Sequence, residues 1–272
     1  GISTWEIDAK GEKLIRDCGC IPNFLHYNGY PASICVSVND EVVHGIPRKD
    51  RYLKEGDIVS LDAGLTYKGY HSDAARTHAV GKVSTEAQKL MDVTKQSLFE
   101  GIKMAKEGQH LHDISRAIEE YVTPYGYGIV RDLVGHGIGT ALHEDPQIPN
   151  YAQKRRGVRL QAGMTLAIEP MINAGTWQVR FLRDGWTVVT KDGSALRKHD
   201  SGDRWGTGDP DVVLRRTQMV GKLAVSLAGH DKGSIFLVIR EDGDVIWLAD
   251  GISRLYQSPK RKKRKHVQLV LN

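Results

Sequence analysis

The sequence predicts an α+β protein made of two unequal units, a large first unit followed by a small β-barrel. Within residues 1–193, strand-like segments come in adjacent pairs and helical segments come in pairs, an order typical of α+β folds. Residues 194–213 lose the apolar pattern and are rich in Gly, Asp, Ser, Arg and Lys, which is typical of a linker. Residues 214–272 carry short apolar runs separated by Gly and Asp turns, which favours a small β-barrel.

The first half of the large unit is expected to contain one helix and two hairpins. Ser3 and Glu6 have the spacing of a capping box, in which each side chain accepts from the other residue's backbone N–H, and Gly19 is a stop signal. Beyond the helix, polar and apolar residues alternate between turn residues, which predicts half-buried strands. The expected elements are a helix from Ser3 to Gly19, a hairpin of Ser33–Asn39 with Val42–His44, and a hairpin of Asp57–Leu65 with His71–Val80 around Lys68-Gly69.

A pair of helices and several shorter strands should follow. Thr85 and Gln88 have the spacing of a second capping box, and Pro124 stops the second helix because proline has no backbone N–H to donate. Short apolar runs predict strands on both sides of the linker. The expected elements are helices Thr85–Ala105 and Leu111–Tyr121, strands Ile129–Val134, Gly163–Glu169 and Trp186–Thr190, and C-terminal strands Leu223–Ser226, Ile235–Ile239 and Val245–Leu248.

Length and composition indicate a cytoplasmic protein with a substantial core. The chain has 272 residues, of which 40% are hydrophobic and 26% charged. No run approaches the roughly 18 apolar residues that a membrane helix needs, and the first residues lack the pattern of a signal peptide. Cys18, Cys20 and Cys35 match no disulfide or metal-binding spacing and are expected to be reduced thiols. We expect a monomer without a membrane partner.

Charge divides the chain at the same place as the elements do. Residues 1–213 carry 26 Lys and Arg against 28 Asp and Glu, whereas residues 214–272 carry 12 against 5. So large a surplus of positive charge in a short segment suits a polyanion. The two units are therefore expected to have different partners.

Two aspartates in the second hairpin are the first candidates for a metal site. A hairpin that turns near Lys68 would place Asp62 and Asp73 opposite each other on one face of the sheet. Two facing carboxylates repel unless a cation lies between them, and a divalent metal ion would supply that cation. The alternative is a pair of solvated aspartates at a sheet edge.

Three further residues could complete such a site. His136 lies between Gly135 and Gly137, which permit a tight backbone, and could be a metal ligand or a base. His143 adds a second imidazole, and Glu169 ends an apolar strand, where a buried carboxylate has to be protonated, paired or metal-bound. The alternatives are packed or surface histidines and a glutamate that faces water.

Taken together, these residues resemble the metal and substrate residues of the type I methionine aminopeptidases in order, spacing and flanking sequence. The resemblance extends from about Gly1 to Asp192. The segment from Ser37 to Pro47 resembles the methionine type rather than the prolidase-like and creatinase-like relatives that share its fold. The most specific segments are Tyr30–Asn39, Val43–Pro47, Gly56–Asp62, Gly135–Gly139 and Ile168–Met171.

The resemblance implies a pita-bread fold and a metal-dependent hydrolase that removes the initiator methionine from nascent polypeptides. It implies two divalent metal ions, with Asp62 on one ion, Asp73 bridging both, and His136 and Glu169 completing the other side. These ligand types suit Co, Mn, Fe or Zn. Two ions close together would lower the pKa of a bridging water from 15.7 to about 7 and so create the nucleophile.

The resemblance also implies substrate contacts. His143 would contact the peptide carbonyl or nitrogen as the tetrahedral intermediate forms, and His44 would act near the amino end of the substrate. A methionine pocket should be apolar and aromatic, because sulfur makes favourable contacts with aromatic edges. The positions that match this pocket are Tyr27, Tyr30, Cys35 and Trp186, for each of which ordinary core packing is the alternative.

The chain departs from the family pattern at both ends of the match. Gly1 opens inside a capping pattern, so we expect the N-terminal segment to be missing. After Lys191-Asp192-Gly193 the family continues into a last strand with a Glu-His-Thr segment, whose glutamate bridges both metal ions. Here Ser194–Gly202 has neither that carboxylate nor a strand pattern, and nothing positions Asp200 or Asp203 as a substitute. We expect a missing last strand, an impaired site, and a deleted or out-of-frame coding segment at the junction.

The C-terminal unit, from about Arg216 to Asn272, resembles the KOW motif of ribosomal and transcription-factor SH3-like barrels. The matching segments are Leu223–Gly233 and the turn Ala249–Gly251. The resemblance implies RNA or the ribosome as the partner, and a solvated basic tail is the alternative. The expected contacts are Lys232 and the basic tail Lys260, Arg261, Lys262, Lys263, Arg264 and Lys265.

The sequence is compatible with two functions of different classes. The first is a methionine aminopeptidase that its C-terminal unit holds near the ribosome. The second is a catalytically inactive pita-bread scaffold that binds nascent N-termini or RNA, and the missing glutamate favours it. Metal content distinguishes the two, because bound ions support the enzyme and their absence supports the scaffold.

Overall fold

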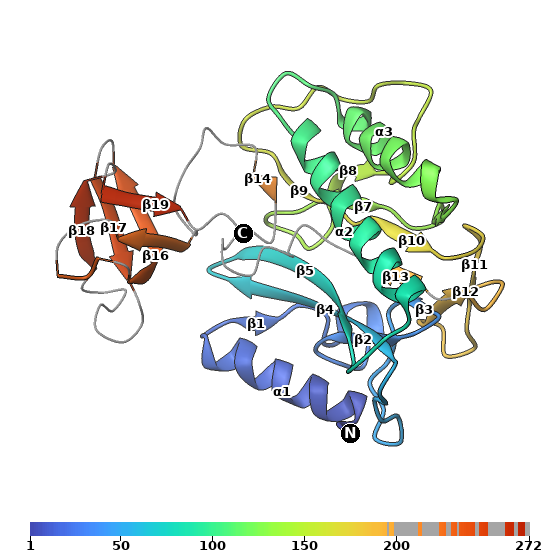
Figure 1. Ribbon diagram of the computed structural model, residues 1–272. Helices are drawn as coiled ribbons and strands as arrows, with labels where there is room; N and C mark the ends of the chain where they lie inside the picture. Colours follow the sequence, from blue (N-terminus) through green and yellow to red (C-terminus); the bar gives the residue numbers. More distant parts are fainter. Residues whose placement is uncertain are drawn as a thin grey trace. The chain divides into compact units, whose positions relative to one another are not determined.

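The computed structural model describes residues 1–194, 196–198, 212–213, 223–226, 230–232, 234–242, 245–249, 259–263 and 266–269 (Figure 1). The chain divides into two compact units. The first unit consists of Gly1–Asp203 and Pro210–Leu214, and the second consists of Arg204–Asp209 and Arg215–Asn272. Among the described residues, no helix combines the length and the apolar character needed to cross a membrane.

The first unit combines three α-helices with short and long antiparallel strands in its described part. Its first half comprises α1 (Thr4–Asp17), β1 (Ile21–Pro22), η1 (Tyr27–Gly29), β2 (Cys35–Val38), β3 (Glu41–Val43), β4 (Ile58–Tyr67) and β5 (Tyr70–Ala79). Its second half comprises α2 (Thr85–Met104), α3 (Leu111–Val122), η2 (Thr123–Tyr125), β6 (Gly128–Ile129), β7 (Gly135–Gly137), β8 (Glu144–Ile148), β9 (Thr165–Ala167), β10 (Met171–Asn173), β11 (Val179–Phe181), β12 (Val188–Thr190), β13 (Leu196–Lys198) and β14 (Val212–Val213).

Helix α1 begins where the sequence predicts because its capping box forms. The Glu6 N–H donates to Ser3 Oγ at 3.2 Å, and the Ser3 N–H donates to Glu6 Oε2 at 2.8 Å. The helix ends at Asp17, and Gly19 adopts a left-handed φ of 72°, which glycine tolerates without strain. The buried Ile15 joins α1 to an apolar core with β2 and β4.

The hairpin of β4 and β5 is confirmed and is the longest pairing in the first unit. The two strands pair from Ile58 opposite Ala79 to Tyr67 opposite Tyr70, and Lys68 and Gly69 form the tip with positive φ angles. The other edge of β4 pairs with β2 and β1. This hairpin carries both predicted aspartate ligands near the middle of its length.

The hairpin predicted from Ser33–Asn39 and Val42–His44 is wrong. β2 pairs with β4, and β3 pairs with β12, so the turn at Asn39-Asp40 connects two sheets. All four residues of β2 are buried, and the ten-residue β4 can satisfy more of its backbone than the three-residue β3 could. The turn at Asn39-Asp40 is confirmed, but each strand pairs with a partner other than the predicted one.

Helices α2 and α3 lie side by side on the strands of the second half (Figure 1). Ser84 caps α2 by accepting from the Ala87 N–H at 3.0 Å, so the N-cap is Ser84 and not the predicted Thr85. Ala87 has no side-chain acceptor, so this cap is a single hydrogen bond and not a capping box. Helix α3 ends at Val122, before Pro124, as predicted. The core of this half includes Leu90, Leu98, Ile114, Ile118, Ile148, Leu166 and Ile172.

The shorter strands were predicted in part. Gly163–Glu169 contains β9, Trp186–Thr190 contains β12, and only the start of Ile129–Val134 is a strand, in β6. The missed strands of this part include β1, β7, β8, β10 and β11, which have two to five residues. Segments of that length show no reliable alternation of polar and apolar residues.

The segment after Ser194 contains the short strand β13, although its sequence shows no strand pattern. The loss of the family's last strand with its glutamate stays a prediction. β13 runs antiparallel to β10 with Lys198 opposite Met171, and β14 pairs with β9. Backbone hydrogen bonds alone can add a short strand to an open sheet edge, whatever its apolar pattern. The two acidic residues considered as substitute ligands, Asp200 and Asp203, lie outside the described residues.

The glycines on both sides of His136 are needed because three strands meet there. β7 lies between β8 and β9 in one sheet. A Cβ on Gly135 would collide with the carbonyl oxygen of Ala167, and a Cβ on Gly137 would collide with that of Asp145. The backbone therefore holds His136 between its two neighbouring strands.

The second unit contains an antiparallel sheet with the strand order β18-β17-β16-β15-β19 among its described residues. Its elements are β15 (Leu223–Ser226), β16 (Ile235–Asp242), β17 (Val245–Ala249), β18 (Lys260–Lys263) and β19 (Val267–Leu269). The first three are the predicted strands. Lys260–Lys263, which were expected to belong to a basic tail, instead form β18, which corrects that prediction for these four residues. The buried core consists of Phe236, Val238, Ile246, Leu248 and Val267.

Gly137→Ala is expected to lower the free energy of unfolding by about 1–3 kcal/mol, because a backbone carbonyl cannot rotate away from the added methyl group. Urea denaturation followed by circular dichroism measures this change. Gly139→Ala is the matched control, since the atom nearest to its Cβ would be a side-chain carboxylate oxygen of Glu144 at 3.1 Å and not a backbone atom. The control should stay within about 0.5 kcal/mol of the wild type. Equal stabilities of the two variants would contradict the tight packing of β7.

Candidate metal centre and its pocket

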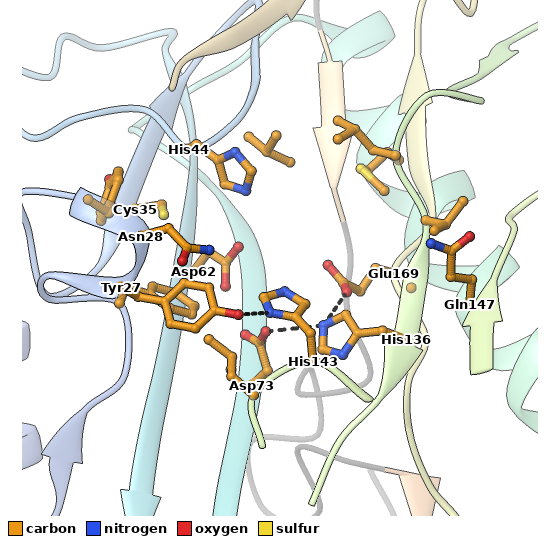
Figure 2. A pocket seen from close by; sticks show the side chains of 18 of the residues that line it. Tyr27, Asn28, Cys35, His44, Asp62, Asp73, His136, His143, Gln147 and Glu169 are labelled. Atoms are coloured by element: carbon orange, nitrogen blue, oxygen red, sulfur yellow. Dashed lines mark hydrogen bonds and ion pairs between the residues drawn. The ribbon is translucent and has the colours of Figure 1, made fainter. Parts of the chain in front are cut away.

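The four predicted metal ligands lie together around one pocket (Figure 2). Asp62 lies on β4, Asp73 on β5, His136 on β7, and Glu169 two residues after the end of β9. Their exposed fractions are 6%, 5%, 7% and 6%, respectively. Two different sheets thus bring residues separated by more than a hundred positions into one buried site.

The register of the long hairpin refines the predicted placement of the aspartates. Asp62 is opposite Ala75, and Asp73 is opposite Gly64. The two carboxylates therefore lie on the same face as predicted, but they are diagonal neighbours rather than direct partners. A diagonal arrangement leaves more space between them than a direct pair would.

His136 lies between two of the carboxylates. Its Nδ1 donates to the Gly137 carbonyl at 2.8 Å, and its Nε2 lies 3.6 Å from Asp73 Oδ2 and 3.3 Å from Glu169 Oε1. Burial acts to lower the pKa of His136, but the interactions with Asp73 and Glu169 outweigh it and raise the pKa to about 10. The backbone contact at Nδ1 thus turns Nε2 toward the acids, as a metal-binding imidazole requires.

The residues of this site fit a divalent metal ion. Ligand atoms of Asp73, His136 and Glu169 all lie within 4.8 Å of one another, and each of the three residues is buried. Two carboxylates beside one imidazole leave excess negative charge in a buried place, which a cation would neutralise. Asp62 borders the same pocket but is outside this group of three in the described part of the chain. Carboxylate and imidazole donors together suit first-row transition metals.

Both predicted catalytic histidines line the pocket. The ring of His143 lies 4.3 Å from that of His136, between centroids, and the Tyr27 hydroxyl forms a 2.9 Å hydrogen bond with His143 Nδ1. This contact orients the His143 ring, as the dashed line in Figure 2 shows. His44 faces Trp186 edge-on, with 6.2 Å between ring centroids. The site therefore has one imidazole beside the candidate ligands and another near the aromatic wall.

An apolar wall adjoins the candidate ligands. The cavity has a volume of about 590 Å³ and is lined by the predicted substrate residues Tyr27, Tyr30, Cys35 and Trp186. Tyr30 is 2% exposed, donates to the Gly45 carbonyl at 3.0 Å, and meets Trp186 edge-on at 5.2 Å between centroids. Tyr30 and Cys35 also belong to an apolar core, so both the pocket and the core-packing interpretations apply to them.

Several residues of the pocket were not predicted. Asn28 and Gln147 add amide groups, and Phe24, Leu142 and Met171 extend the apolar wall. Asn28 follows the predicted Tyr27, Leu142 precedes the predicted His143, and Met171 lies two residues after Glu169, so proximity in the sequence is the available signal for these three. Nothing in the local sequence of Phe24 or Gln147 indicates that they reach the same cavity.

The predicted RNA-binding cations of β18 divide between the two faces of the strand. Lys260 and Lys262 each place Nζ 2.9 Å from a carboxylate oxygen of Asp231. Burial acts to raise the pKa of Asp231, but these two lysines hold it well below its usual range. Arg261 and Lys263 alternate with them and are exposed. The other predicted contacts are Lys232, exposed in a turn, and Arg264 and Lys265, outside the described residues.

Comparison with known proteins points to one family. The sequence profile of metallopeptidase family M24 matches residues 1–200. A methionine aminopeptidase of Clostridium acetobutylicum is 52% identical over 201 residues, which make up 74% of this chain and 80% of that relative. Methionine aminopeptidase 1 of Bacillus subtilis is 53% identical over 193 residues, 71% of this chain and 77% of the relative.

Solved structures show the same fold. Methionine aminopeptidase from Thermotoga maritima matches with a TM-score of 0.72 at 46% identity, and the match covers 74% of this chain and 80% of the Thermotoga chain. An X-Pro aminopeptidase from Thermotoga maritima, 22% identical with a TM-score of 0.58, covers 79% of this chain and 51% of its own and shares the fold alone. The pita-bread fold predicted for the first unit is confirmed.

In the metal-free chain, His136 is expected to make stability depend on pH. Its folded pKa of about 10 lies above the ordinary value of 6.5, so its stabilisation is fully present below about pH 6.5 and is lost as the pH rises through about 10. The difference in free energy of unfolding between the wild type and His136→Gln, measured with EDTA present, should shrink over this range. A constant difference for His136→Gln would contradict the prediction.

Proposed function

The chain belongs to metallopeptidase family M24 and to its methionine aminopeptidases, and we propose that it removes the N-terminal methionine of nascent polypeptides by metal-dependent hydrolysis. One observation carries the proposal: the buried cluster of Asp73, His136 and Glu169 opens onto an apolar and aromatic pocket. A peptidase needs these two parts side by side, because the chemistry at the peptide bond has to occur where the methionine side chain is held.

We propose that the metal centre holds two divalent ions, of Co, Mn, Fe or Zn. Asp73, His136 and Glu169 would hold one ion, and Asp62 with Asp73 would hold the other. Bound ions supply the polarisation of the scissile carbonyl and lower the pKa of a coordinated water from 15.7 to about 7. The set of three close ligands supports tighter binding of the first ion than of the second.

The remaining residues of the pocket would bind and orient the substrate. His143, held by Tyr27, would donate to the carbonyl oxygen as charge develops on it, and His44 would act near the substrate's amino end. Tyr30, Cys35 and Trp186 would enclose the methionine side chain, since aromatic edges attract sulfur. The burial of this wall would exclude water from the side chain of the substrate.

The enzyme is favoured over the inactive scaffold. Methionine aminopeptidases about half identical in sequence match the part of the chain that carries the metal centre. The scaffold was favoured by one departure from the family, the lack of a Glu-His-Thr segment in the sequence after Gly193. We therefore propose an active site that works with the four carboxylate and imidazole ligands named above and at a reduced rate.

We also propose that residues 214–272 form a KOW-type SH3-like domain that binds RNA or the ribosome. The surplus of 12 basic over 5 acidic residues supports a polyanionic partner. Binding near the ribosome would keep the peptidase, as a cytoplasmic monomer, close to emerging N-termini. The described residues that support this partner include the exposed Lys232, Arg261 and Lys263.

Hydrolysis of a Met-Ala-Ser tripeptide by the purified chain, with added Co or Mn, tests the enzyme. Asp73→Asn should lower kcat/KM by more than about 100-fold. Loss of a residue that only hydrogen-bonds to a metal ligand costs about 10–100-fold, and loss of the ligand itself should cost more. Asp50→Asn, an exposed acid paired with Arg48 outside the pocket, is the control and should retain wild-type activity. The bound metal, measured in the same samples, should fall only in Asp73→Asn.

A folded wild-type chain without turnover would contradict the proposed activity, and without bound metal it would favour the scaffold. Turnover that survives Asp73→Asn would place the catalytic centre elsewhere.

His143→Ala is expected to lower kcat by about 10²–10³-fold with little change in KM, because its proposed contact strengthens only as the carbonyl oxygen gains charge. Tyr27→Phe keeps the ring but removes the hydroxyl that orients His143, so we expect a smaller decrease in the same parameter. Steady-state kinetics with the same tripeptide measure both. An effect of Tyr27→Phe confined to KM would show that the tyrosine binds substrate without positioning His143.

A further inference from the structure

The outward face of the C-terminal sheet carries an aromatic ring between two guanidinium groups. Trp247 on β17 is opposite Arg240 of β16 on one side and Arg261 of β18 on the other. The Arg240 Cζ lies 4.2 Å from the centroid of the Trp247 ring, and the Arg261 Cζ lies 5.4 Å from it. We name these three residues the Arg-Trp-Arg ladder. Both distances are within the range of cation–π attraction.

A β-bulge places Arg240 in the ladder. Val238 is opposite Leu248 and Arg240 is opposite Trp247, so Ile239 is the extra residue of β16. Without the bulge, Ile239 would face Trp247 and Arg240 would turn toward the core, where Ile246 and Leu248 are fully buried. The bulge thus replaces an apolar neighbour of Trp247 with a cation.

The cations of β18 lie on two opposite faces of the strand and make different contacts. Lys260 and Lys262 are committed to Asp231, and the Lys262 side chain is only 8% exposed. Arg261 and Lys263 lie on the opposite face, next to Trp247 and Val245. The sheet therefore directs positive charge to the face that also carries its aromatic ring.

We infer that the Arg-Trp-Arg ladder is a platform on which single-stranded RNA stacks its bases. The inference rests on the proposed RNA-binding function and assigns it to one face. Unpaired bases stack on aromatic rings and on guanidinium planes, whereas the bases of a duplex are stacked on each other and shielded. The attraction of Trp247 holds the guanidinium groups in place before RNA arrives, which reduces the entropy lost on binding. Arg261 and Lys263 are placed to contact the adjoining phosphates.

Fluorescence anisotropy of a labelled 12-nucleotide single-stranded RNA, titrated with the full chain at several salt concentrations, tests the ladder. Trp247→Ala should weaken binding by about 5- to 150-fold, the range expected for losing one stacked base. Its salt dependence should match that of the wild type because no charge is lost. Arg261→Ala should reduce the slope of log Kd against log salt by about 0.7.

Two conservative variants keep the test valid if Trp247→Ala fails to fold. Trp247→Phe retains a smaller ring and should bind between the wild type and the alanine variant. Arg261→Lys retains the charge but not the planar group, so it should bind more weakly at an unchanged salt slope. Circular dichroism verifies the fold of each variant.

The outcomes separate the ladder from RNA binding itself. If Trp247→Phe and Arg261→Lys both bind RNA as tightly as the wild type does, the proposed role of the ladder is overturned and the RNA-binding function is retained. Equal affinity for a 12-base-pair duplex would likewise overturn it in favour of phosphate contacts alone. No binding of RNA by the wild type would overturn both, while leaving the peptidase proposal untouched.

Discussion

The first unit depends on a single constraint, the burial of several carboxylates around one imidazole. Asp62, Asp73 and Glu169 are each 5–6% exposed, yet they converge on the same pocket as His136. Such a group is stable only if a cation shares it. In the metal-free chain the imidazole supplies that charge, since its interactions raise its pKa to about 10. Binding of a divalent ion would displace the proton. The same buried negative charge would thus be neutralised by the imidazolium in the metal-free chain and by the ion in the metal-bound chain.

The site is rigid because its walls are parts of the apolar core. Tyr30 and Cys35 line the pocket and also pack among Phe24, Ile138 and Leu142. On the other side, the glycines around His136 bring its strand into direct contact with the neighbouring backbones. Neither wall can move without loss of packing, which is the condition for holding a peptide bond at a fixed place beside a metal centre.

The second unit uses the alternation of a β-strand to separate charges that are adjacent in sequence. A run of lysines and arginines suggests a uniform cationic segment, but successive side chains of β18 point to opposite faces. One face is neutralised by Asp231 and the other surrounds Trp247. The same composition would act as a diffuse attractor of phosphates in a tail, whereas in a strand it becomes a surface with a defined geometry.

The sequence by itself determined the features that depend on neighbouring residues. These features span only a few positions each: the capping box of Ser3 and Glu6, the tip of the long hairpin at Lys68-Gly69, and the family motifs around His136 and Glu169.

The tertiary structure decided which strands pair, the diagonal placement of Asp62 and Asp73, and the strand formed by Lys260–Lys263. It also decided the contact of Tyr27 with His143, which are 116 positions apart. Local signals fix backbone conformation through nearby hydrogen bonds, but the choice of a distant partner depends on which arrangement buries the most apolar surface and satisfies the most backbone, and no short segment contains that information.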